Sequence, residues 1–193
     1  KGRITFDDVI DFIREEAEKD YQMVSGISGD VEPGDKVREI LRARLPWLLI
    51  GLIGGILGAI VLGSHEQTLA KVTELAFFIP LIAAMAGNVG VQSSSIVVQS
   101  IASGVKDLET TSRKLFKEVS VAMVTAAIFA ALIFAYNLIR QGDMDLTYTV
   151  SLSLFIVILF ASFFGTVIPL VLNRFKIDPA LATGPFITTM NDI

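Results

Sequence analysis

The stretch LTYTVSLSLFIVILFASFFGTVIPLVLN, residues 146–173, contains no charged side chain. Three further uncharged runs occupy residues 45–64, 75–105 and 119–139. A helix of about 20 predominantly apolar residues crosses the hydrocarbon core of a bilayer, which is about 30 Å thick. The sequence therefore predicts four membrane-spanning helices.

A fifth apolar stretch starts at residue 179 and runs to the last residue, 193. It is too short to span a bilayer, so we expect a fifth helix that is cut short by the end of the sequence. The alternative is a short re-entrant or interfacial segment. The predicted fold class is an all-α, polytopic membrane helix bundle.

Composition agrees with this fold only because the charges are segregated. Hydrophobic residues make up 52% of the 193 residues and charged residues 19%, and the mean hydropathy is +0.63. The first 44 residues hold 8 of the 16 Lys and Arg residues and 11 of the 20 Asp and Glu residues. This pattern excludes a soluble globular protein, a disordered chain and a nucleic-acid-binding module, which would need a basic face. The absence of cysteine excludes disulfides, thiolate metal sites and a cysteine nucleophile.

Basic residues predict the orientation in the membrane. Lys and Arg accumulate on the cytoplasmic side of membrane proteins. A cytoplasmic N-terminus places ten of the basic residues that flank the spans inside and leaves only Lys71 and Arg140 outside. The ten are Lys36, Arg38, Arg42, Arg44, Lys106, Arg113, Lys114, Lys117, Arg174 and Lys176.

The N-terminal residues form a separate, amphipathic part. Thr5 and Asp8 have the spacing of a capping box, and the apolar residues that follow recur at helical spacing. Gly26 and Gly29 end this helix, and a second amphipathic stretch, residues 36–45, leads directly into the first span. Because the sequence has no initiator Met and opens inside a structural element, we expect a fragment of a longer protein.

The second span carries unusual polar residues. Its apolar sequence includes Gly87, Asn88, Gly90 and Gln92 and then three serines, residues 93–95. Asn88 and Gln92 are four residues apart and so share one helix face. Buried amides in hydrocarbon need partners, so this face predicts either a water-filled pathway or interhelical hydrogen bonds. In the first span, Gly-x-x-x-Gly pairs at positions 51/55 and 54/58 predict close helix packing.

Asp192 is an ionisable residue in the last apolar stretch. Intramembrane carboxylates usually mark an ion or proton pathway, and the alternative is a position at the interface. Thr188, Thr189 and Asn191 supply further oxygen atoms nearby. Such hard ligands suit Mg²⁺, Ca²⁺ or Mn²⁺. A single carboxylate is a thin site for a divalent ion, and two-fold dimerisation would supply a second one.

Other polar residues have simpler interpretations. Asp178 precedes Pro179 and is placed to cap the fifth helix. His65 is expected in a solvated outer loop, and Glu74 and Glu118 are expected as interfacial charges at helix ends. The sequence contains no nucleotide-binding GxxxxGK[ST] motif, so we expect no ATP-driven pump within this fragment. It also lacks a convergent set of acid, base and nucleophile in the spans, so we predict that the chain is not an enzyme.

Taken together, these motifs resemble a known family. Pro80-x6-Gly87-Asn88-x-Gly90-x-Gln92 resembles the signature of the MgtE magnesium channels and of their relatives in solute carrier family 41. Residues 44–49 resemble the beginning of that family's first membrane helix, and residues 178–192 resemble its fifth. Residues 2–9 resemble the last strand and helix of a CBS domain.

The resemblance implies a homodimer in the plasma (inner) membrane, with five helices per subunit and a pore on the two-fold axis. Asp192 matches the pore carboxylate that recognises hydrated Mg²⁺, Asn88 matches a residue on the facing helix, and Asp178 matches an acidic position at the cytoplasmic mouth. It implies three parts: residues 1–24 as a CBS remnant, residues 25–45 as the connecting (plug) helix, and residues 46–193 as the pore domain. Mg²⁺ is the expected ion, with Mn²⁺ and Co²⁺ as further candidates.

The residues themselves favour a cation pathway, and the resemblance implies a magnesium channel driven by the membrane potential. One alternative is a divalent-cation exchanger coupled to Na⁺ or H⁺, whose flux would depend on the counter-ion gradient. Another is a magnesium-binding membrane scaffold that conducts no ions and has a second span serving only for packing.

Overall fold

A computed structural model describes residues 4–27, 31–102, 108–182 and 184–192. It does not describe the side chains of residues 108–115, 181, 182, 185, 191 and 192. The described elements are all helical and follow one another as α1 (Phe6–Val24), α2 (Val37–Ser64), α3 (Glu66–Lys71), α4 (Thr73–Ala102), α5 (Leu108–Ile139), α6 (Met144–Arg174), the 3₁₀ helix η1 (Pro179–Ala182) and α7 (Pro185–Asp192).

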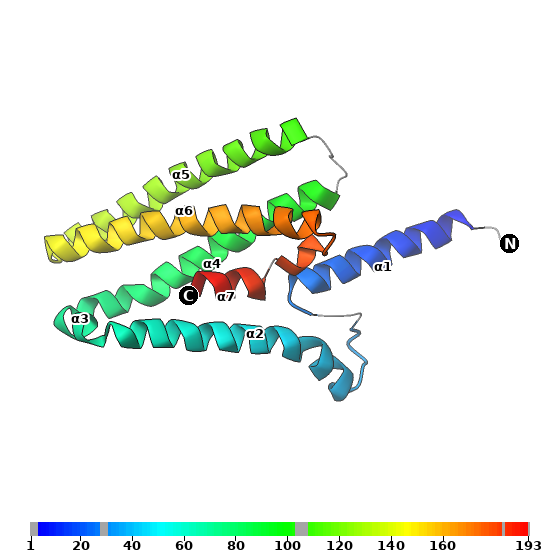
Figure 1. The fold of residues 1–193 in the computed structure, drawn as a ribbon, viewed down its shortest axis with the longest axis horizontal. Helices are drawn as coiled ribbons and strands as arrows, with labels where there is room; N and C mark the ends of the chain where they lie inside the picture. Colours follow the sequence, from blue (N-terminus) through cyan, green and yellow to red (C-terminus); the bar gives the residue numbers. More distant parts are fainter. Residues whose placement is uncertain (1–3, 28–30, 103–107, 183, 193) are drawn as a thin grey trace.

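Four helices are long and apolar enough to cross a membrane. They are α2, α4, the part of α5 from Phe116 to Ile139, and α6. The described part of each of the four uncharged runs falls on one of these helices, and residues 103–105 of the second run lie outside the described residues. Figure 1 shows the α5–α6 turn at the same end of the bundle as α3, as expected for helices that alternate in direction. The predicted all-helical membrane bundle is therefore confirmed.

Helix α6 is the centre of the bundle and packs against both α4 and α5. Val150, Leu154, Ile158 and Ala161 form its buried apolar stripe. Toward the C-terminal end of α6, Gly165 lies very close to Gly90 of α4. A Cβ atom added to Gly165 would lie 3.1 Å from the Cα atom of Gly90 and closer still to the carbonyl oxygen of Gly90. Small residues permit this approach, as is typical of helices that pack in lipid.

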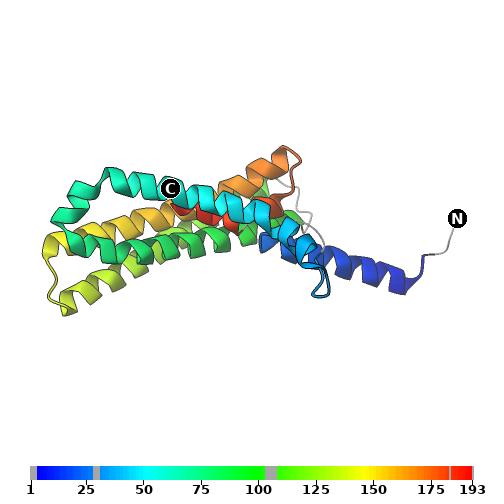
Figure 2. The same ribbon diagram turned by 90° about the horizontal axis from the view of Figure 1, so that it is seen from below.

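The fifth apolar segment differs from the expected single helix. It divides into η1 and α7, and Gly184 between them has a positive φ of 60°, a backbone conformation that L side chains rarely adopt. Helix α7 lies between α2 and α4 (Figures 1 and 2), and these are its main contacts. The predicted close packing at the glycines of α2 is present at Gly54, which is buried against the side chain of Thr189.

Helix α1 projects from one end of the bundle (Figures 1 and 2). The predicted capping box is present, and the helix ends before Gly26, which has a φ of 76°. Residues 4 and 5, the described part of the strand suggested by the CBS resemblance, are not in a strand. Residues 37–45 continue into the first span as one helix, α2, as predicted.

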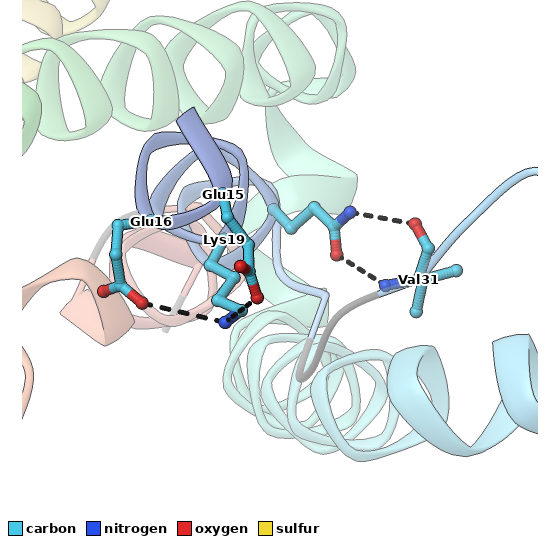
Figure 3. Close-up of polar contacts among 5 residues, drawn as sticks. Glu15, Glu16, Lys19 and Val31 are labelled. Carbon is cyan, nitrogen blue, oxygen red and sulfur yellow. Dashed lines mark hydrogen bonds and ion pairs between the residues drawn. The ribbon is translucent and has the colours of Figure 1, made fainter. Parts of the chain in front are cut away.

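Polar contacts stabilise α1 and the linker that follows it (Figure 3). Lys19 forms ion pairs with Glu15 at 2.8 Å and Glu16 at 3.7 Å. The side-chain amide of Gln22 donates to the carbonyl of Val31 at 2.9 Å and accepts from its N–H group at 3.0 Å. This pair of hydrogen bonds holds the linker against the end of α1.

Candidate functional site

A groove of about 480 Å³ lies along one face of α4, where α7 approaches it. Asn88 and Gln92 both line it, so the two amides share one face as their spacing predicts. Both residues are exposed. Among the described side chains, its lining consists of Ala83, Ala84, Gly87, Asn88, Val91, Gln92 and Thr188.

Thr188 is the contribution of α7 to this groove. A Cβ atom at Gly87 would lie 3.5 Å from the Thr188 methyl group, so the glycine leaves room for α7 beside α4. The Thr188 hydroxyl donates to the carbonyl of Gly184 at 3.3 Å. The next residue, Thr189, turns instead toward Gly54 of α2. The groove therefore presents two amides and one hydroxyl from two different helices.

The three predicted metal-binding residues lie in different parts of the structure. Asn88 lies in the groove. Asp178 is exposed, precedes η1, and accepts a hydrogen bond from the N–H group of Ala180 at 2.9 Å, which is the predicted capping role. Asp192 ends α7, and its side chain lies outside the described residues. Within the described part of the chain, no group of three or more His, Asp or Glu residues could hold a metal ion.

A second acidic residue lies near Asp178. Burial, and then the negative charges of Asp178 and Glu16, raise the pKa of Asp20 above its usual value of 3.8. Asp20 belongs to the last turns of α1, and α1 contacts η1. The negative charge of Asp178 thus acts on a carboxylate of α1, a segment far from it in the sequence, where α1 contacts η1.

Sequence reasoning missed a polar contact inside the bundle. Glu118 was expected at an interface, yet its carboxylate accepts a hydrogen bond at 3.0 Å from the hydroxyl of Ser93, which is buried. Ser93 also bonds the buried Ser162 of α6, with 3.0 Å between the two hydroxyl oxygens. The serines of residues 93–95 drew attention to α4, but nothing in the sequence identified their partners. His65 is exposed between α2 and α3, as predicted.

Four helices long enough to span a membrane, one of which exposes two amides to a groove, define the class of polytopic helical membrane proteins. The family model described as "MgtE: Divalent cation transporter" matches residues 79–193, which include most of α4, all of α5 and α6, and the whole fifth segment. The chain belongs to the MgtE family of divalent cation transporters. This membership confirms the family resemblance and the prediction that the chain is not an enzyme.

Three relatives, each named magnesium transporter MgtE, match the whole chain. The proteins of Bacillus subtilis, Enterococcus faecalis and Thermus thermophilus are 35%, 32% and 30% identical to it. The chain spans 43%, 42% and 43% of the length of these relatives.

Proposed function

We propose that this chain carries magnesium ions across a membrane, and that the groove between α4 and α7 lines the pathway. The observation that carries the proposal is the exposure of Asn88 and Gln92 to one groove on an otherwise apolar spanning helix. Amides exposed to lipid would lack hydrogen-bond partners, whereas amides beside a water-filled path retain them. The names of the relatives supply the identity of the ion.

The chemistry of the groove suits a hydrated divalent ion. Mg²⁺ gives up its water shell reluctantly, so it is recognised largely through hydrogen bonds from its bound water to oxygen atoms around it. Asn88, Gln92 and Thr188 supply such oxygen atoms. Position 192 comes one turn after Thr188 along α7, on the same face by helical periodicity. We therefore assign the carboxylate of the site to Asp192.

A two-fold dimer would complete this site. One chain offers one carboxylate and a groove that is open on one side, and a second copy facing it would enclose the path and double the charge. The homodimer and a pore on its axis are part of the proposal. A transmembrane potential contributes about 2.3 kcal/mol per elementary charge per 100 mV, so a divalent ion gains about twice that.

We place the cytoplasmic mouth of this path beside Asp178 and the N-terminus on the same side, in the plasma membrane. Asp178 lies with Asp20 where α1 contacts η1. A divalent cation would relieve the repulsion between these two carboxylates, which supports Asp178 as a second metal-binding position. The division into a CBS remnant at 1–24, a connecting segment at 25–45 and a pore domain at 46–193 belongs to the same proposal.

Magnesium flux into proteoliposomes that contain the intact protein tests the proposal. We expect Asp192→Asn to lower the flux by about tenfold or more, which corresponds to weakening one ion contact by about 1.4 kcal/mol. Asn88→Ala should lower it less, because an amide contributes no charge. Asp145→Asn is the matched control, since this exposed aspartate lies in the first turn of α6, away from the groove. Unchanged flux in Asp192→Asn would remove the carboxylate from the pathway.

The same vesicles distinguish the alternative functions. Flux that requires an opposing Na⁺ or H⁺ gradient would establish an exchanger in place of a channel. Magnesium binding without any flux or current would establish a scaffold.

A further inference from the structure

Helix α4 has two faces with different surroundings. One face lines the groove with Asn88 and Gln92. The opposite face is buried and consists of Ala86, Val89, Gly90, Ser93 and Ser94. Successive residues of a helix differ by 100° around its axis, so a rotation of that size would exchange Gln92 for Ser93. Asn88 and Gln92 therefore face the groove only if α4 keeps its present orientation about the helix axis.

Small residues alone do not fix that rotation. Ala86 and Gly90 present little side-chain surface to α6, and Gly165 opposite them has no side chain at all. Such a contact brings two backbones close together but offers few side chains that interlock. The larger side chains of α4 that pack against the apolar core, Phe78, Ile82 and Met85, all precede this part of the helix. A directional interaction on the same face would hold the orientation of the part that carries Asn88 and Gln92.

A chain of hydrogen bonds through three helices provides this directional interaction. A carboxylate can only accept, so the Ser93 hydroxyl donates its one proton to Glu118, across 3.0 Å. The Ser162 hydroxyl must then donate to the oxygen of Ser93, also across 3.0 Å. Ser93 and Ser162 are 3% and 2% exposed, which shields both bonds from competition with water.

We propose that Glu118 is a positioning residue for the ion pathway. Its carboxylate holds Ser93 of α4, and through Ser93 it holds Ser162 of α6, so that α4 keeps Asn88 and Gln92 in the groove. The assignment rests on the proposed function for its biological meaning, whereas its physical content is the rotation of α4. Glu118 belongs to α5, so α5 controls a groove that none of its described side chains lines.

Cysteine accessibility measures the rotation directly, because the natural chain has no cysteine. Val91→Cys places a single thiol in the groove, and its rate of reaction with a water-soluble methanethiosulfonate is measured in the intact protein. Adding Glu118→Ala or Ser93→Ala should slow the reaction, by at most about tenfold, because losing a hydrogen bond to a charged group shifts the rotation equilibrium by about that factor. Glu118→Gln should keep the rate within about twofold, because its amide oxygen still accepts from Ser93.

Two further serines of α6 supply a matched control and a milder variant. Ser151→Ala also removes a buried hydroxyl from α6, but the Ser151 oxygen has no hydrogen-bond partner among the described residues, so the rate should not change. Ser162→Ala removes only the far end of the hydrogen-bond chain, so it tests the relay if Glu118→Ala fails to fold. We expect it to slow the reaction, and less than Ser93→Ala does.

Three results would overturn the inference. The first is a wild-type reaction rate in both Glu118→Ala and Ser93→Ala. The second is an equal loss of rate in Ser151→Ala, which would indicate general loosening of the bundle. The third is a Glu118→Gln protein that loses magnesium flux while its thiol reacts normally, since Glu118 would then act on the ion itself. Absence of flux in the wild-type protein would refute the proposed function but would leave the accessibility result valid.

Discussion

The three-helix core, formed by α4, α5 and α6, and the N-terminal helices α1 and α2 are packed in different ways. In the core, α6 packs directly against α4 and α5 over most of its length. By contrast, α2 has its main contact with α7, and α1 has its main contact with η1. An 18-residue apolar stretch of α6 is 39% buried, whereas a stretch of the same length in α2 is only 11% buried. The mean hydropathies of the two stretches, 2.6 and 2.4, are similar.

This difference shows that hydropathy identifies spanning helices without ranking them by burial. Helix α6 is central because it carries small and hydroxyl residues on a single stripe, among them Ser162, Gly165 and Thr166. Helix α2 has exposed Leu and Ile residues along most of its length. The fifth segment therefore connects the N-terminal helices to the core, and substitutions in the two regions should have unequal effects.

The largest effect is expected where two backbones of the core meet. Gly165→Ala would place a methyl group against the backbone of Gly90, which cannot rotate away as a side chain can. We expect it to lower the free energy of unfolding by about 3 kcal/mol, the upper end of typical overpacking costs. Thermal and denaturant-induced unfolding of the protein in detergent measures this change.

Gly55→Ala on α2 is the control for this prediction. A Cβ atom at Gly55 would have no neighbour within 4 Å among the described residues, so only the helix propensity changes. That change favours alanine by about 1 kcal/mol or less. Equal destabilisation by both substitutions would contradict the contrast between the core and α2.

An intermediate effect is expected at the contact between α2 and α7. Gly54→Ala would collide with the Thr189 side chain, which can adjust at a cost of about 1–2 kcal/mol. Thr189→Ser removes the colliding methyl group and should restore most of that loss in the double variant. A double-mutant cycle on unfolding free energies measures the coupling. Strictly additive effects would show that α7 does not hold α2 in this way.

Hydropathy and spacing predicted the parts of this molecule that depend on local sequence. The four spans, the capping box at Thr5 and the shared face of Asn88 and Gln92 all follow from periodicity within one segment. The break in the fifth segment had a local signal that was overlooked, since Gly184 followed by Pro185 is a strong turn marker.

The contacts between distant segments could not be predicted. Glu118 reads as an interfacial charge because its neighbours include Lys117, while its partner Ser93 lies 25 residues earlier on another helix. The same holds for Gly90 and Gly165, whose close approach depends on how α4 and α6 cross. A single sequence contains the residues of such pairs but not their pairing.

The smallest effect is expected at the contact between α1 and η1, and it should depend on pH. Burial and the charges of Asp178 and Glu16 raise the pKa of Asp20 in the folded protein above 3.8. The packed arrangement of α1 therefore favours the protonated acid. Its stability is fully present below the usual pKa and declines as pH rises through the raised value, so at neutral pH the charge of Asp20 weakens this contact.

Asp20→Asn removes that charge while keeping the size of the side chain. At neutral pH it should slow amide hydrogen exchange in the last turn of α1, because the repulsion from Asp178 is gone. Well below pH 3.8 the variant and the wild type should exchange alike, because Asp20 is then uncharged in both the packed and the released state. Asp11→Asn, a change at an exposed position of the same helix, should leave exchange unaltered at both pH values. Faster exchange in Asp20→Asn at neutral pH would mean that the carboxylate stabilises the contact, and that α1 is held to η1 by a charge interaction of the opposite sign.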